Sequence, residues 1–142
     1  MLQHLRRLLP ALWAGVLICI AALAAPAAFA NLAVADAGRV VGHIFVREAW
    51  LSLALAALLL GLDRLHGATG RTNVLLLWGT VACTLLGYFA IQPLMPAARV
   101  GQGVLSFGQL HLISTLFYGL KTALVLVLAW RMAGDLSRRP SS

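Results

Sequence analysis

The chain alternates between long apolar runs and short polar connections. Four apolar runs stand out, at about residues 8–30, 43–62, 74–94 and 107–131. A helix needs about 20 residues to cross the hydrocarbon core of a bilayer, so each run predicts a transmembrane helix. The runs use nearly the whole chain. We therefore expect a single integral membrane domain over residues 1–142, folded as an all-α, four-helix transmembrane bundle.

The fourth run carries polar side chains at helical spacing. His111, Ser114, Tyr118 and Lys121 fall within about half a turn of each other on a helix, and leucines fill most of the remaining surface. A lysine near the middle of a span costs about 2.5–3.5 kcal/mol on insertion scales. This face is therefore expected to turn toward other helices or toward water.

Composition agrees with a membrane protein. The chain is 61% hydrophobic and 11% charged, whereas soluble domains average about 25% charged residues. The formal net charge of +7 does not indicate nucleic acid, because the basic residues are spread over loops and ends and form no patch with interleaved aromatics. The lipid bilayer is the expected partner, with a homo-oligomer or other membrane proteins as further partners.

The basic residues instead predict an orientation. With both termini in the cytoplasm (N-in/C-in), cytoplasmic segments hold more arginines than the opposite side, as the positive-inside rule requires. The two sets are Arg6, Arg7, Arg64, Arg71, Arg131, Arg138 and Arg139 inside, and Arg39, Arg47 and Arg99 outside. We expect a multi-pass protein of the bacterial cytoplasmic (inner) membrane.

Two segments allow more than one interpretation. The first run has a basic start and ends in Ala28-Phe29-Ala30, which is also typical of a cleaved secretory signal, although the run is long for one. Residues 31–42 are mildly amphipathic, with Asp36 and Arg39 three apart. They predict a short interfacial helix or an extension of the flanking helices, with a plain loop as the alternative.

Small residues recur at four-residue spacing on two of the expected helices. They predict stripes for close helix packing, Gly15 and Cys19 on the first helix and Gly79, Cys83 and Gly87 on the third, which Pro93 and Pro96 are expected to close. The two cysteines fall at similar depths, where soft thiolates could bind Cu(I). Packing is the favoured interpretation, because buried cysteine behaves as a small hydrophobe.

His43 and His111 begin the two helices that run inward from the outer side, so they are expected at comparable depth. Facing imidazoles could bind a metal ion or a haem iron. No spaced histidine pair or haem-attachment motif accompanies them. A hydrogen bond between helices is the favoured interpretation, and these histidines remain weak metal candidates.

Glu48 and Lys121 are the most costly groups to place in lipid. Counted from His43 and His111, Glu48 lies about 7 Å and Lys121 about 15 Å into the membrane, a difference that long side chains can bridge. One interpretation is a buried ion pair that fixes two helices in register. The other is a polar cavity that binds a solute or relays protons. This hypothesis gives a tentative ligand-binding cluster, His43, Glu48, His111, Tyr118 and Lys121.

Several short marks follow one another along residues 8–131. They are Gly15, Pro26 and Phe29, then Gly38, Gly42 and Phe45, then Pro93, Met95 and Arg99, and finally His111 and Ser114. Their order resembles domain of unknown function 4149, a family of small bacterial membrane proteins to which eukaryotic transmembrane protein 205 looks related. The resemblance implies four membrane helices, and for the eukaryotic relative a role in handling metal-containing compounds.

Three functions follow from these observations. The first is binding or movement of a small solute or metal ion at the intramembrane cluster. The second is a membrane scaffold or assembly role, in which the Gly79–Cys83–Gly87 stripe binds other helices. The third is a haem-binding oxidoreductase. Enzymatic activity is not the favoured interpretation, because no serine lies in a nucleophile-elbow motif and no phosphate-binding loop is present.

Overall fold

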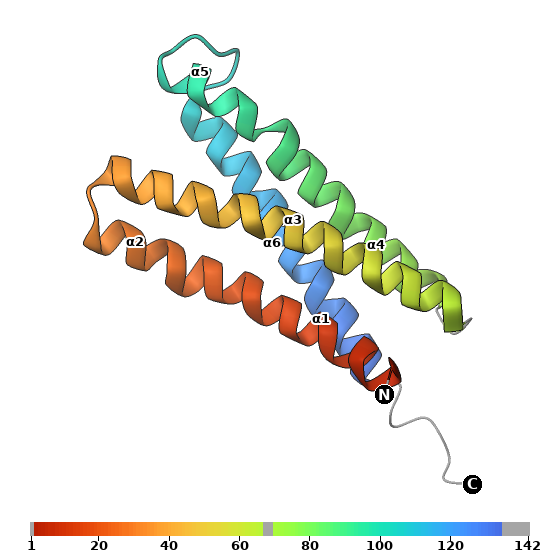
Figure 1. Cartoon of the computed structure of the whole chain (residues 1–142). Coiled ribbons are helices and arrows are strands. Elements are labelled where there is room, and N and C mark those ends of the chain that lie inside the picture. The colour runs from red at the N-terminus through yellow and green to blue at the C-terminus, as the bar shows by residue number, and fades with distance from the viewer. Residues whose placement is uncertain (1, 67–69, 135–142) are drawn as a thin grey trace, which may run out of the picture.

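Figure 1 shows the computed structural model of the chain, which describes residues 2–66 and 70–134. Four helical segments follow one another, and each is long and apolar enough to cross a membrane. The first consists of α1 (Leu2–Cys19), the π-helix η1 (Ile20–Ala24) and α2 (Ala25–Asn31), and the second is α3 (Val34–His66). The third consists of α4 (Arg71–Thr84), the π-helix η2 (Leu85–Ala90), the 3₁₀-helix η3 (Gln92–Leu94) and α5 (Met95–Arg99), and the fourth is α6 (Phe107–Gly134). The predicted all-α, four-helix architecture is confirmed, while Arg138 and Arg139 lie outside the described residues.

The connection between the first two spans is very short. α2 ends at Asn31 and α3 begins at Val34, so residues 31–42 extend the flanking helices, and the alternatives of a separate interfacial helix and a plain loop are wrong. Asp36 lies in the first turn of α3, where the helix dipole favours a carboxylate, and it pairs with Arg39 one turn later. These local interactions favour helix from the first residues after the turn.

The prolines of the third span do not end its helical path. Pro93 lies in the first turn of η3 and Pro96 in the first turn of α5. A backbone N–H at such a position has no partner within the helix, so proline loses no hydrogen bond there. The path therefore continues to Arg99, five residues beyond the predicted end at Leu94. Pro26 likewise lies in the first turn of α2. A π-helical segment precedes the prolines in both the first and the third span.

The core lies where α1, α3, α4 and α6 meet. Its largest members are Trp13, Leu17, Leu59, Leu77 and Leu128, which are at most 1% exposed. Three- or four-residue spacing separates Trp13 from Leu17 in α1 and Val125 from Leu128 and Met132 in α6, so each of these helices presents one face to the others. α6 packs against both α1 and α4 and so forms the centre of the bundle.

The small-residue stripe of the third span packs against α6. A Cβ built on Gly87 would lie 2.5 Å from Cβ of Phe117, and one on Gly79 would lie 3.0 Å from Leu124. Glycine is needed at position 87 because the two helices approach too closely there for any side chain. Gly79 and Gly87 therefore face α6 of the same chain and are not open to another protein, while a packing role for Cys83 stays a prediction.

Gly15 and Cys19 behave differently. Both are exposed on α1, and no atom outside its helix lies within 4 Å of a Cβ built on Gly15. Close helix packing at this stripe therefore stays a prediction. The face with Trp13 and Leu17 turns inward instead, because its larger side chains bury more apolar surface and the Trp13 indole finds a hydrogen-bond partner on α3.

The spans diverge toward one end of the bundle. In Figure 1 the turn between α2 and α3 points away from α5 and the start of α6, whereas the start of α1 lies near the end of α6. We call the end with residues 32–33 and 100–106 the open end and the opposite one the closed end. At the open end a small cluster of Ile91, Met95, Ala98 and Leu110 holds the third span against α6.

Candidate functional site

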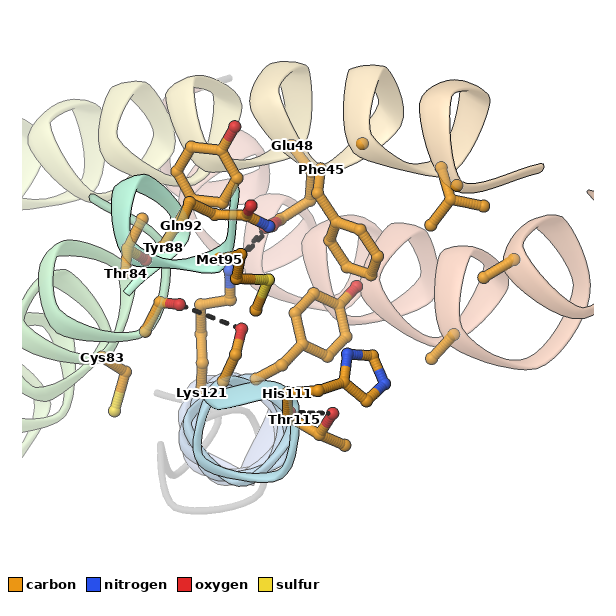
Figure 2. A pocket seen from close by; sticks show the side chains of 18 of the residues that line it. Phe45, Glu48, Cys83, Thr84, Tyr88, Gln92, Met95, His111, Thr115 and Lys121 are labelled. Carbon is orange, nitrogen blue, oxygen red and sulfur yellow. Dashed lines mark hydrogen bonds and ion pairs between the residues drawn. The ribbon is translucent and has the colours of Figure 1, made fainter. Parts of the chain in front are cut away.

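A cavity of about 390 Å³ lies between the diverging spans. All four spans contribute to its wall. Ala21 and Ala25 come from the first span, Gly42 and Phe45 from α3, segments η2 to α5 form a third side, and α6 forms the fourth from Phe107 to Lys121. The volume lies within the range of about 300–1,000 Å³ typical of small-molecule sites. Figure 2 shows the side chains that surround it.

An ion pair forms the deep part of the wall. Lys121 Nζ donates hydrogen bonds to both carboxylate oxygens of Glu48, at 2.7 Å to Oε1 and 2.8 Å to Oε2 (Figure 2). The two side chains are only 4% and 3% exposed. Glu48 lies 14 residues after Val34, and Lys121 lies 14 residues after Phe107. α3 thus begins nine residues before the predicted start at His43. Glu48 and Lys121 are therefore equally far from the starts of their helices, and the predicted difference in their depth disappears.

The ion pair continues into a chain of hydrogen bonds. Ser52 Oγ donates to Glu48 Oε1, and Trp13 Nε1 donates to Ser52 Oγ at 3.0 Å. α1, α3 and α6 are therefore joined through one buried polar network. Such a network offsets part of the cost of burying two charges, because each added hydrogen bond satisfies a lone pair of the carboxylate or the hydroxyl.

Tyr118 forms the wall beside the ion pair. Its hydroxyl donates to the Leu17 carbonyl oxygen at 2.9 Å, and its ring packs edge-on against Phe45, with centroids 5.2 Å apart. Lys121 Nζ lies 4.8 Å from the centre of the same ring. The ring therefore shields one side of the ammonium group while leaving the cavity lined by an aromatic face.

Hydroxyl groups of α6 bond to backbone carbonyls near the π-helical segments. Ser114 Oγ donates to the carbonyl of Gly87 within η2, at 3.0 Å, and the Leu17 carbonyl bound by Tyr118 lies just before η1. π-helical turns interrupt regular α-helical pairing and are frequent at functional sites. The irregular backbone of the first and third spans is thus held in place by side chains of α6.

Three planar groups stack where the cavity approaches the open end. The guanidinium carbon of Arg99 lies 4.8 Å from the centre of the Phe107 ring, and that ring is stacked on His111 with centroids 6.0 Å apart and an interplanar angle of 17°. We call Arg99, Phe107 and His111 the rim stack. All three line the cavity, and Arg99 and His111 are exposed.

Comparison with known proteins places the chain in a family. The family model described as domain of unknown function (DUF4149) matches residues 8–103. The chain belongs to this family. The match confirms the resemblance seen in the sequence, and it covers Glu48 and Arg99, while His111, Ser114 and Lys121 lie beyond it. No curated protein and no solved structure matches the chain.

In this DUF4149 protein the predicted cluster divides into two parts. Glu48, His111, Tyr118 and Lys121 line one cavity, whereas His43 is exposed and does not line it. The difference follows from the phase of α3. Val41, Phe45 and Glu48 face the cavity, and His43, two residues from Val41 and two from Phe45, lies on another side of the helix.

The DUF4149 cavity offers no dense set of metal ligands. Within residues 2–66 and 70–134, no group of three or more His, Cys, Asp or Glu side chains is placed to hold a metal ion. His111 faces the cavity without His43, and Cys83 faces it while Cys19 lies exposed on α1. The arrangement does not fit a haem held between the two histidines or Cu(I) held between the two cysteines.

Several residues of the wall and of the hydrogen-bond chain behind it were not singled out from the sequence as members of the site. They are Trp13 and Ser52 in the hydrogen-bond chain, Thr84 and Gln92 on the third span, and Arg99 and Phe107 in the rim stack. Ser52 and Glu48 are four residues apart, so their contact had a visible signal in the sequence. The others depend on which helices are neighbours.

Proposed function

We propose that this membrane protein binds a small solute in the cavity between its four spans. The observation that carries the proposal is a cavity of about 390 Å³ at membrane depth whose wall combines apolar side chains with a buried ion pair. Ionisable groups inside a membrane commonly mark binding sites or pathways. A bundle that needed only stability would gain as much from apolar side chains at positions 48 and 121.

The solute is an organic molecule rather than a bare metal ion. Thr84, Gln92 and Thr115 add hydrogen-bonding groups to a wall that is otherwise rich in Ala, Gly and aromatic residues. A mostly apolar pocket with a few polar groups is typical of sites for small organic ligands. The Glu48–Lys121 pair closes the deep end of the cavity.

We further place the protein in the cytoplasmic membrane of a bacterium, with both termini inside. Arg6, Arg64, Arg71 and Arg131 then lie on the cytoplasmic side, in agreement with the positive-inside rule. The open end of the bundle faces outward, and a solute enters from that side. Alkaline phosphatase fused within residues 100–106 would be active in this orientation, and it would be inactive in the reverse one.

Filling the cavity tests the binding function. Gly42 and Gly61 both lie on α3, but Gly42 lines the cavity and Gly61 does not. A Cβ added at either glycine would meet no neighbouring atom within 4 Å. Gly42→Leu should therefore occupy the cavity, while Gly61→Leu is a matched control that adds the same side chain to an exposed face. Both variants are expected to accumulate in the membrane.

The measurement is native mass spectrometry of gently purified protein, followed by identification of released small molecules. We expect a bound mass with the unaltered protein and with Gly61→Leu, and an approximately tenfold or greater loss with Gly42→Leu, because a leucine side chain takes up volume the solute needs. Equal retention by both variants, or no bound molecule on the unaltered protein, would contradict the proposal.

A further inference from the structure

We infer that the solute is a single-chain amphiphilic acid, bound with its anionic group at the rim stack and its apolar chain along the cavity wall. This inference rests on the proposed binding function and adds the chemical class of the ligand. It is built from the charges around the cavity, the geometry of Arg99 and the distribution of apolar side chains.

The charges of the cavity wall do not cancel. Glu48 is the one acidic residue among the wall residues in the described part of the chain, and its oxygens already accept hydrogen bonds from Lys121 and Ser52. Lys121 and Glu48 neutralise each other, which leaves Arg99 as a cation without a carboxylate in the wall. A cavity with this balance favours an anion over a cation or a neutral molecule.

Arg99 is suited to bind that anion. Its contact with Phe107 is a cation–π interaction at 4.8 Å, which fixes the side chain without supplying a carboxylate to its N–H groups. A guanidinium group binds carboxylate and phosphate oxygens through two parallel N–H donors. His111, whose ring is stacked on Phe107, places an imidazole N–H donor on the same rim.

The apolar part of the ligand has a defined path. Ala25, Phe29 and Val41 line one side of the cavity, and Phe45 and Met95 are labelled around the same space in Figure 2. The deep end is closed by the ion pair, whose own groups satisfy each other. An acid group is therefore expected at the rim, near the membrane boundary, and not beside Lys121.

The cavity volume limits the number of chains. At about 390 Å³ it lies near the lower end of the range for small-molecule pockets. This space suits one short hydrocarbon chain or one ring system. Such a ligand is either a free fatty acid from water or a lysophospholipid from the bilayer. Both carry one anionic group and one hydrocarbon chain.

The test uses the full chain in phosphatidylcholine nanodiscs and two photoreactive probes. One is decanoic acid with a diazirine on its chain, and the other is the matching alcohol, which has the same chain without the charge. Labelled peptides are mapped by mass spectrometry. We expect the acid to label cavity residues at a frequency about tenfold above the alcohol, because only the acid forms charged hydrogen bonds with Arg99.

Two substitutions of exposed arginines at the open end separate a specific site from general attraction. Arg99→Gln should reduce labelling by the acid about tenfold and leave labelling by the alcohol unchanged. Arg39→Gln is the control, because Arg39 lies at the same end but pairs with Asp36 and does not line the cavity. Equal loss in both variants would overturn the inference, since it would show attraction by surface charge alone.

The outcomes separate this inference from the proposed function. If Gly42→Leu removes labelling by both probes while Arg99→Gln affects neither, the cavity binds a solute and the acid inference fails. If neither probe labels the cavity, the acid inference fails and the binding function is decided by the molecules that co-purify. Where the acid probe does label the cavity, unlabelled decanoate and a lysophosphatidylglycerol are added as competitors. Competition by either supports the inference and identifies its source, and competition by neither overturns it.

Discussion

The closed and open halves of this bundle are built from the same four spans but differ in what lies between the helices. In the closed half, Trp13, Leu17, Leu59 and Leu77 fill the space between the helices. In the open half several inward positions of the first two spans are taken by small residues, and the helices diverge around a cavity (Figure 1). Those small inward residues are Ala21, Ala25, Gly38 and Gly42. The cavity thus depends on small side chains as much as on helix placement.

Each half also contains an ion pair, in a different setting. Arg6 and Asp63 join α1 to α3 at the closed end, with 2.5 Å between the paired atoms, and their side chains are 16% and 3% exposed. Lys121 and Glu48 are both almost fully buried. Water can reach the Arg6 side of the closed-end pair and partly replace a lost cation there, whereas neither side of the deeper pair is open to water. The comparison predicts that the deeper pair is the more sensitive one.

Removing the deeper cation should have the largest effect. Lys121→Met leaves the Glu48 carboxylate buried without its partner, and we expect a loss of about 3–5 kcal/mol in the free energy of unfolding. Arg6→Met should cost less, about 1–3 kcal/mol, because its site borders water. Both are measured by unfolding in mixed micelles of increasing dodecyl sulfate content, followed by tryptophan fluorescence.

A double variant provides the control for this prediction. Glu48→Gln combined with Lys121→Met removes both charges, so the double variant should be more stable than Lys121→Met alone. Equal losses for Lys121→Met and Arg6→Met, or no recovery in the double variant, would show that the two ion pairs are equivalent and that burial depth does not matter.

Crowding the contact between the third span and α6 should have the next largest effect. Gly87→Ala brings a Cβ to 2.5 Å from Cβ of Phe117, so the helices must separate, at a cost of about 1–3 kcal/mol. Gly119→Ala on α6 is the matched control, because an added Cβ there meets no neighbouring atom within 4 Å. It should be neutral or slightly stabilising, since alanine favours helix over glycine. The same unfolding assay applies, and equal behaviour of the two variants would contradict the close contact.

Removing a single hydrogen bond should have the smallest effect. Trp13→Phe keeps most of the ring volume but removes the N–H that donates to Ser52, and we expect a loss of about 1 kcal/mol. Trp130→Phe is the control, because Trp130 is 83% exposed. The thermal midpoint of each purified variant, from size-exclusion chromatography after heating, gives the comparison. A larger shift for Trp130→Phe would show that the hydrogen-bond chain has no role in stability.

Much of the fold follows from the sequence because lipid imposes simple rules. Run length predicted four spans, and the cost of isolated charges predicted the pairing of Glu48 with Lys121. The exact ends of the helices were harder to predict from the sequence. The start of α3 was placed at His43 because its first nine residues are only mildly apolar, and the extension to Val34 depends on local pairing between Asp36 and Arg39.

The site was only partly predictable for a related reason. Glu48, Tyr118 and Lys121 were found because charges and hydroxyls are rare in such spans. His43 was included in the predicted cluster because histidine is a candidate ligand. The contacts of Phe45 and Glu48, however, decide which face of α3 turns to the cavity, and His43 does not lie on that face. Arg99 was assigned to the outer loop from its position after the prolines, and its place in the wall required the continued helical path through α5.

The π-helical turns have a consequence for insertions and deletions. Along the first span, positions 13, 17, 21 and 25 all face inward, and in an α-helix this four-residue spacing drifts steadily around the axis. Wider turns within residues 20–24 and 85–90 offset that drift, because each holds more residues than an α-helical turn. Deleting one residue there would rotate the part of the span toward the open end by about 100°, which moves residues that now line the cavity out of its wall while leaving the part at the closed end in place.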